Sequence, residues 1–136
     1  MTYLNNVKNW VQNNTFSSLD YSNIDDLYLK KENKTISLVI PTLNEESTIE
    51  YIIRKIFNEL NKNFQIIDEL IVIDGNSTDK TIHILKKLKT EYKLLHVVYE
   101  KDILKNYKCK KGKGNQLWKG LYLSLIHISE PTRLGA

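Results

Sequence analysis

Gly112-Lys113-Gly114 places a lysine between two glycines, directly before the helix-like run NQLWKGL. Glycine lets a backbone approach a ligand closely, and a helix N-terminus favours an anion, so this segment could hold a phosphate group. It is not a P-loop, because that motif requires G-x-x-x-x-G-K-[ST] and Gly114 and Asn115 follow Lys113. The residue types at this point predict an anion-binding loop.

Two further polar segments each follow an apolar, β-branched run. PTLNEE follows TISLVI, and GNSTD follows ELIVID, which ends at Asp74. A carboxylate at a strand end can accept hydrogen bonds from base or sugar donors. Ser47, Glu50, Ser77 and Asp79 in and beside these segments are also typical of helix caps, so both interpretations stay open.

The other chemistry-bearing residues form no recognisable site. His83, His96 and His127 lack metal-ligand spacing, and a single cysteine, Cys109, excludes an internal disulfide and a cysteine-cluster metal site. The lysines at 105, 108, 110 and 111 are expected to be solvated, since nucleic-acid binding needs a more extended basic face with interleaved aromatics.

Length and composition favour one soluble α/β unit. The chain has 136 residues, of which 41% are hydrophobic and 26% charged, and its net charge is +4. We expect a cytoplasmic protein, because no signal-peptide-like start and no apolar run of about 18 residues is present. The mild positive charge is concentrated before Gly112, which favours a local anion site over a basic surface.

The elements that must position these loops lie in residues 35–124. Apolar runs at 35–41, 69–74 and 94–100 predict three strands, and apolar spacing predicts helices over 49–60, around 82–88, and from Gly114. Ser47 and Glu50 suggest a capping box for the first helix, and Trp118 falls on the expected core stripe of the last. Alternating strands and helices predict a parallel sheet with flanking helices, and its three polar loops converge at one edge.

Residues 1–34 read as an N-terminal arm with one helix. It is polar, with scattered apolar and aromatic side chains that we expect to pack onto the domain: Trp10, Phe16, Tyr21, Leu27 and Tyr28.

VIPTLNEE and ELIVIDGNSTDKT together resemble the donor-binding loops of nucleotide-sugar glycosyltransferases with the GT-A fold, a Rossmann-like architecture. GKGNQLWKGL is similar to a motif of one such family, the glucosyl-3-phosphoglycerate synthases. The segments NWVQNNTFSSLDYSNIDDLYLKK and VVYEKDIL also resemble that family. The resemblance runs from about residue 10 to about residue 124.

The resemblance implies a retaining transfer of glucose from UDP-glucose to 3-phosphoglycerate, with a divalent metal, magnesium or manganese. By matching position, the donor-binding residues would be Pro41, Thr42, Leu43, Glu45, Asp74, Ser77 and Lys113. The first four would line the uridine pocket, Asp74 and Ser77 would lie on the base and ribose side, and Lys113 would reach the diphosphate or the uridine. A homodimer of the full-length parent is compatible with the resemblance.

The end of the chain departs from the family pattern. The family continues to a metal-binding Asp-x-Asp motif, whereas this chain reads LIHISEPTRLGA, with no Asp-x-Asp. Residues 125–136 resemble translated adapter sequence, so we expect a non-native tail. Residues 35–124 would then be a partial GT-A domain without catalytic residues or metal ligands, inactive by itself.

Two alternatives remain. One is a GT-A transferase with another acceptor, such as a polyprenyl phosphate. The other is a non-catalytic nucleotide- or nucleic-acid-binding module, in which the lysine loop grips phosphates and nothing is transferred.

Overall fold

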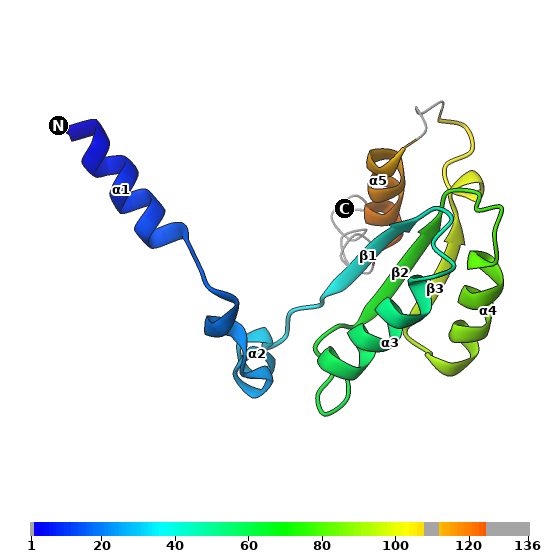
Figure 1. Ribbon diagram of the computed structural model, residues 1–136, viewed down its shortest axis with the longest axis horizontal. Helices are drawn as coiled ribbons and strands as arrows, with labels where there is room; N and C mark the ends of the chain where they lie inside the picture. Colours follow the sequence, from blue (N-terminus) through cyan, green and yellow to red (C-terminus); the bar gives the residue numbers. More distant parts are fainter. Residues whose placement is uncertain (1, 108–111, 125–136) are drawn as a thin grey trace, which may run out of the picture.

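The computed structural model describes residues 2–107 and 112–124 and shows an α/β domain with an N-terminal arm (Figure 1). Three parallel strands form the sheet in the order β1-β2-β3. They are β1 (Ser37–Thr42), β2 (Glu69–Asp74) and β3 (Leu95–Tyr99). All six residues of β2 are buried, as expected for a central strand covered on both faces.

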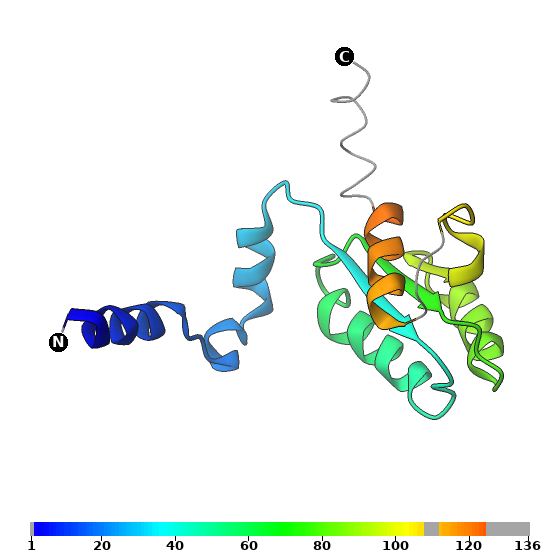
Figure 2. The same cartoon turned by 90° about the horizontal axis from the view of Figure 1, so that it is seen from above.

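Helices cover both faces of this sheet (Figures 1 and 2). One face carries α3 (Ile49–Leu60) and α4 (Thr81–Glu91), and the other carries α5 (Lys113–Leu123). The larger core cluster joins α3 and α4 to the sheet through Ile53, Leu85 and Val72, each fully buried. The predicted order of strands and helices from residue 35 is therefore confirmed.

The start of α3 differs from the expected capping box. The helix begins at Ile49, and Thr48 at the N-cap makes no side-chain capping bond. The Thr48 hydroxyl instead donates to Glu45 Oε2 at 2.8 Å, and Glu50 pairs with Arg54 one turn further on. The capping-box prediction was wrong because the N-cap is Thr48 instead of Ser47, and because the Glu50 carboxylate pairs with Arg54.

The buried face of α5 is also different from the predicted one. Trp118 is 44% exposed and Leu121 58% exposed, whereas Gln116, Lys119 and Gly120 are buried against the sheet. At Gly120 an added Cβ would lie within 2.8 Å of Ile73 Cδ1. The absence of a side chain at Gly120 lets the helix approach the sheet, and this approach turns the aromatic face outwards.

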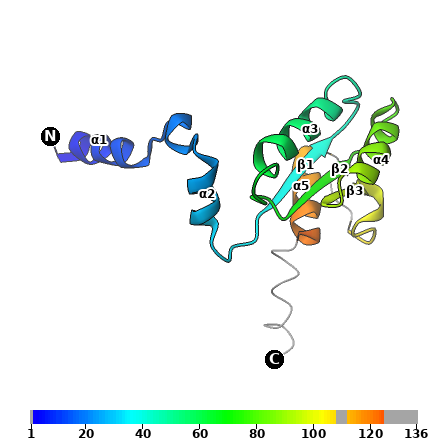
Figure 3. The same cartoon turned by 90° about the horizontal axis from the view of Figure 1, so that it is seen from below.

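The N-terminal arm consists of two helices, α1 (Thr2–Asn14) and α2 (Ile24–Lys31), joined by the 3₁₀ turn η1 (Ser18–Tyr21). It extends away from the sheet (Figures 1 and 3). The expectation of one helix was wrong, and so was the expected packing of Trp10 and Phe16, which are 66% and 65% exposed. The packing expected for Tyr28 is present.

Only the end of the arm is fastened to the domain by side-chain contacts of the described residues. Lys31 Nζ donates to Asp68 Oδ1 at 2.8 Å, and the Tyr28 ring stacks on Phe64 with centroids 4.8 Å apart. None of the helices in the described ranges is long and apolar enough to cross a membrane.

Candidate functional site

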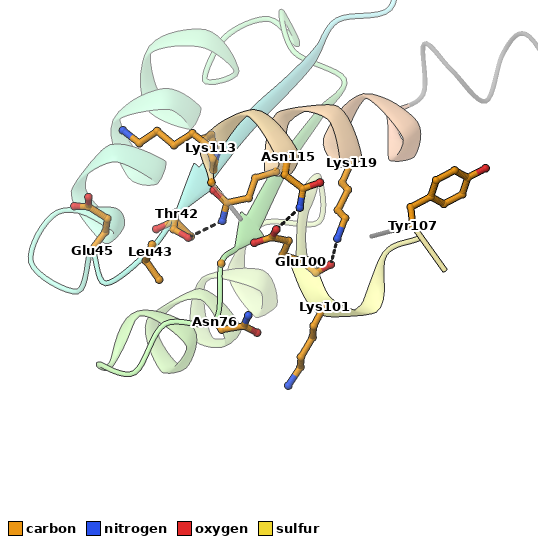
Figure 4. Close-up of a pocket in the computed structure, with 14 residues that line it drawn as sticks. Thr42, Leu43, Glu45, Asn76, Glu100, Lys101, Tyr107, Lys113, Asn115 and Lys119 are labelled. Carbon is orange, nitrogen blue, oxygen red and sulfur yellow. Dashed lines mark hydrogen bonds between the residues drawn. The ribbon is translucent and has the colours of Figure 1, made fainter. Parts of the chain in front are cut away.

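A cavity of about 740 Å³ opens beyond the carboxyl ends of the strands (Figure 4). Its walls come from the loops after all three strands and from the start of α5. The lining residues are Pro41, Thr42, Leu43, Glu45, Gly75, Asn76, Glu100, Lys101, Tyr107, Gly112, Lys113, Asn115, Gln116 and Lys119. The predicted convergence of three polar loops is thus observed, at the edge where open parallel sheets bind ligands.

Five of the predicted donor-binding residues line this cavity: Pro41, Thr42, Leu43, Glu45 and Lys113. Asp74 and Ser77 do not. Asp74 is fully buried, and its carboxylate accepts hydrogen bonds from the backbone N–H and the hydroxyl of Ser77, at 2.9 and 2.5 Å. In this structure the two residues shape the turn after β2 rather than face the cavity.

The loops after β1 and β2 are joined by reciprocal hydrogen bonds. Asn44 adopts a left-handed backbone with φ of 55°, which lets its N–H donate to Ser77 Oγ at 2.9 Å while its side-chain oxygen accepts from Thr78 N at 2.8 Å. Glu46 N donates to Asp79 Oδ2, and Lys80 N donates back to Glu46 Oε2. The two loops therefore form one rigid wall.

Asp79 is a structural carboxylate of this wall. Burial tends to raise its pKa, but hydrogen bonds from the hydroxyl and N–H of Thr81 and from Glu46 N hold the pKa below its ordinary value. Asp79 Oδ1 accepts the Thr81 N–H at 2.9 Å just before α4, but the N-cap of this helix is Lys80, which makes no side-chain capping bond, so the cap interpretation of Asp79 was wrong.

Two cavity residues that the sequence did not single out, Gln116 and Glu100, connect α5 to the ends of the strands and the loops that follow them. Gln116 is buried, and its side-chain N–H group lies 3.3 Å from Thr42 O and 3.5 Å from Ile73 O. The lack of a side chain at Gly75 leaves room for this amide. The sequence does not reveal that Gln116 is buried, because a polar residue in an amphipathic helix normally lies on the solvent side.

Glu100, the first residue of η2 (Glu100–Asp102), ties the loop after β3 to the same helix. Its carboxylate accepts a hydrogen bond from Asn115 Nδ2, and its backbone oxygen accepts one from Lys119 Nζ at 2.8 Å (Figure 4). The partners Asn115 and Lys119 lie one turn apart on α5. This pair of contacts fixes the third wall of the cavity.

Two buried polar atoms around the cavity have no hydrogen-bond partner in the described part of the chain, Thr42 Oγ1 and Asn115 Oδ1. The whole of Thr42 is only 3% exposed. Buried polar groups are nearly always paired in folded proteins, so two unpaired atoms around one cavity indicate a place for a polar ligand.

The charges at the cavity suit an anion with hydroxyl groups rather than a metal ion held by this chain alone. Lys101, Lys113 and Lys119 line it, together with the carboxylates of Glu45 and Glu100. Within residues 2–107 and 112–124, no three His, Cys, Asp or Glu side chains are grouped as metal ligands. The residues present therefore fit a phosphate-bearing ligand and do not fit the divalent metal that the resemblance implies.

The profile of Glycosyl transferase family 2 matches residues 37–106, which hold all three strands and two of the three cavity loops. The chain belongs to glycosyl transferase family 2. Among curated relatives, the glucosyl-3-phosphoglycerate synthase of Petrotoga mobilis is 40% identical over 120 residues, which are 85% of this chain and 35% of the relative. That of Mycobacterium tuberculosis (strain H37Rv) is 37% identical over 72% of this chain and 28% of its own length.

Solved structures are also similar to this chain. The Mycobacterium tuberculosis glucosyl-3-phosphoglycerate synthase in complex with Mn²⁺, UDP-glucose and phosphoglyceric acid superposes with a TM-score of 0.63 and 35% identity, over 75% of this chain and 34% of that one. Mannosyl-3-phosphoglycerate synthase from Rubrobacter xylanophilus gives 0.63 and 29%, over 73% and 30%. The GT-A fold is thereby confirmed, and the chain spans about a third of the length of these relatives.

Proposed function

We propose that this chain is the nucleotide-sugar-binding portion of a glucosyl-3-phosphoglycerate synthase, which transfers glucose from UDP-glucose to 3-phosphoglycerate with retention. The observation that carries the proposal is the cavity at the strand ends, whose walls include Lys113, Thr42 and Glu45. The family relatives solved with UDP and with phosphoglyceric acid support the choice of donor and acceptor.

In the proposed complex, the β1 loop holds the uridine. Pro41 and Leu43 supply apolar surface, Thr42 offers an unpaired hydroxyl, and Glu45 offers a carboxylate to N–H or O–H donors. Asp74 and Ser77 contribute to the base and ribose side by holding the shape of the second loop.

Lys113 and the N-terminus of α5 are assigned to the diphosphate. Gly112, the N-cap, adopts φ of 140°, a conformation that glycine tolerates, and its side-chain-free surface leaves the cavity open beside Lys113. Negative charge develops on the departing diphosphate during glycosyl transfer, so a lysine beside it would stabilise the transition state.

A divalent metal would neutralise the same diphosphate, but the described residues offer it no ligand set. The Asp-x-Asp pair is also missing from the sequence. The proposal therefore places the metal ligands and the transfer chemistry outside this chain, and the chain alone should bind a donor without transferring its sugar.

Titration calorimetry with the 136-residue chain and UDP tests the proposal. We expect UDP to bind more tightly than inorganic phosphate, and Lys113→Ala to weaken UDP by about tenfold, the value of one charge-assisted hydrogen bond. The matched control is Lys105→Ala, which removes an exposed lysine outside the cavity and should leave UDP affinity unchanged. No UDP binding by the unmodified chain would refute the nucleotide-sugar assignment.

The sugar and acceptor are tested in the whole protein that contains this chain. We expect glucosyl-3-phosphoglycerate from UDP-glucose, 3-phosphoglycerate and Mg²⁺ or Mn²⁺. A mannosyl donor is the second candidate, because the chain also resembles mannosyl-3-phosphoglycerate synthase. Turnover with a polyprenyl phosphate and none with 3-phosphoglycerate would contradict the proposed acceptor.

A further inference from the structure

Lys119 is a buried cation that the proposed function does not yet use. The residue is only 7% exposed, yet it lines the cavity from the middle of α5. Its ammonium carries three N–H donors, and its one hydrogen-bond partner in the described part of the chain is the backbone oxygen of Glu100 at 2.8 Å. The side chain thus has donor capacity beyond what the fold consumes.

Within residues 2–107 and 112–124, no carboxylate forms an ion pair with this ammonium. Among the described residues, no Asp or Glu oxygen lies within 4.0 Å of Lys119 Nζ, although six other ion pairs are formed. The nearby Glu100 carboxylate is engaged by Asn115 instead. Burying an ammonium without a counter-ion is unfavourable, so an anionic ligand in the cavity would stabilise Lys119.

The other two lysines of the cavity are placed differently. Lys113 is exposed, and Lys101 lies beside the Tyr99 ring, 5.7 Å from its centroid. Figure 4 shows both side chains extending outwards, whereas Lys119 points inwards to Glu100. Lys113 and Lys101 can meet an anion at the mouth, while Lys119 can meet it only inside the cavity.

An independent observation also indicates a ligand at this place. The Thr42 hydroxyl is buried, lines the same cavity and has no partner in the described residues. A cavity that holds both an unpaired hydroxyl and a cation without a counter-ion can satisfy both with one ligand that carries a phosphate.

We propose that Lys119 is the inner phosphate contact of this cavity and that it binds a phosphate group through its ammonium. The inference rests on the proposed function, in which that phosphate belongs either to the diphosphate of the donor or to the phosphorylated acceptor. A neutral N–H donor at this position could also donate to the Glu100 backbone oxygen, so that contact does not need a positive charge. We therefore assign the charge of Lys119 to the binding of the phosphate.

The test compares Lys119→Gln, which keeps an N–H donor but loses the charge, with Lys119→Arg, which keeps both. Calorimetry with the 136-residue chain measures dissociation constants for UDP, uridine, inorganic pyrophosphate and 3-phosphoglycerate. We expect Lys119→Gln to weaken UDP and pyrophosphate by about tenfold or more and uridine by less than about twofold. Lys119→Arg keeps the positive charge and should weaken these ligands less than Lys119→Gln does, and the exposed control Lys105→Gln should change nothing.

The ligand arms separate the two sources of phosphate. A loss confined to UDP and pyrophosphate assigns Lys119 to the donor, and a loss confined to 3-phosphoglycerate assigns it to the acceptor. Equal weakening of UDP and uridine, or no weakening of any phosphate ligand, would overturn the inference and leave Lys119 as a support for Glu100.

A measurement on the unmodified chain covers the case in which Lys119→Gln does not fold. The ¹⁵N resonance of Lys119 Nζ should shift when the chain is saturated with pyrophosphate, while that of Lys105 should not. A Lys119 signal that neither saturating pyrophosphate nor saturating 3-phosphoglycerate moves would overturn the inference. Pyrophosphate carries no nucleoside, so a shift of the Lys119 signal supports the phosphate contact independently of the nucleotide. If UDP and uridine did not bind, the proposed function would be refuted while this result could still stand.

Discussion

Gly120→Ala should destabilise the protein even though alanine is the better helix former. The helix gains about 1 kcal/mol from the exchange of glycine for alanine in its interior. Against this, the new Cβ would collide with Val39 Cγ1 and lie within 2.8 Å of Ile73 Cδ1. Ile73 is fully buried in the central strand, which leaves its Cδ1 little room to move, so the overpacking cost is about 3 kcal/mol, the upper end of the range for added methylene groups.

The net expectation is a loss of about 2 kcal/mol, which in a domain of this size lowers the melting temperature by roughly 8–16 °C. Gly114→Ala is the matched control in the same helix, because an added Cβ there meets nothing within 4 Å. It should be neutral or stabilising by up to about 1 kcal/mol. Urea unfolding followed by circular dichroism measures both variants. Equal stability of the two would refute the close approach of α5 to the sheet.

Two other predictions concern single polar side chains. Burial raises the pKa of Asp68, but hydrogen bonds from Lys31 and a backbone N–H outweigh it, so the pKa lies below its ordinary value. A lowered pKa in the folded state stabilises the protein fully above about pH 4 and less as the pH falls through the folded value. Urea unfolding from about pH 7 to about pH 3 should therefore show a steeper loss of stability in the unmodified chain than in Asp68→Asn, and parallel curves would contradict this. Thr42→Val removes the unpaired hydroxyl and should stabilise the unliganded chain by about 1 kcal/mol while weakening UDP; a variant that is less stable and binds UDP normally would show that the hydroxyl serves the fold.

The sequence predicted the sheet well because its signals were local. The run ELIVID is apolar throughout its centre, and all six residues of β2, Glu69 to Asp74, are buried. Parallel strands place their following loops at one edge, so the meeting of Thr42 and Lys113 in one cavity follows from the order of strands and helices along the chain.

What the sequence could not predict depended on distant partners. Trp118 was expected in the core because its spacing puts it on the apolar stripe of the helix, but the lack of a side chain at Gly120 decides which face of α5 lies on the sheet. The sequence carries no local signal for the burial of Gln116 and Lys119, because their side chains donate to the backbone oxygens of Thr42 and Glu100, which lie at the end of β1 and just after β3. The packing of the arm was mispredicted for a similar reason. The apolar side chains of a segment do not reveal whether another part of the protein packs against them.

The hydrogen bonds that join the loops after β1 and β2 bear on the entropy of ligand binding. Ordering the backbone of one residue costs about 1–2 kcal/mol of free energy. In these loops the backbone is already ordered when the protein folds, because residues such as Asn44 and Ser77 hydrogen-bond across the two loops. A ligand that enters the cavity meets a wall already in its final shape, so little of its contact energy is lost to ordering the protein. Modest contacts by a small polar ligand can thus give measurable affinity, with little rearrangement of these loops between the free and bound forms.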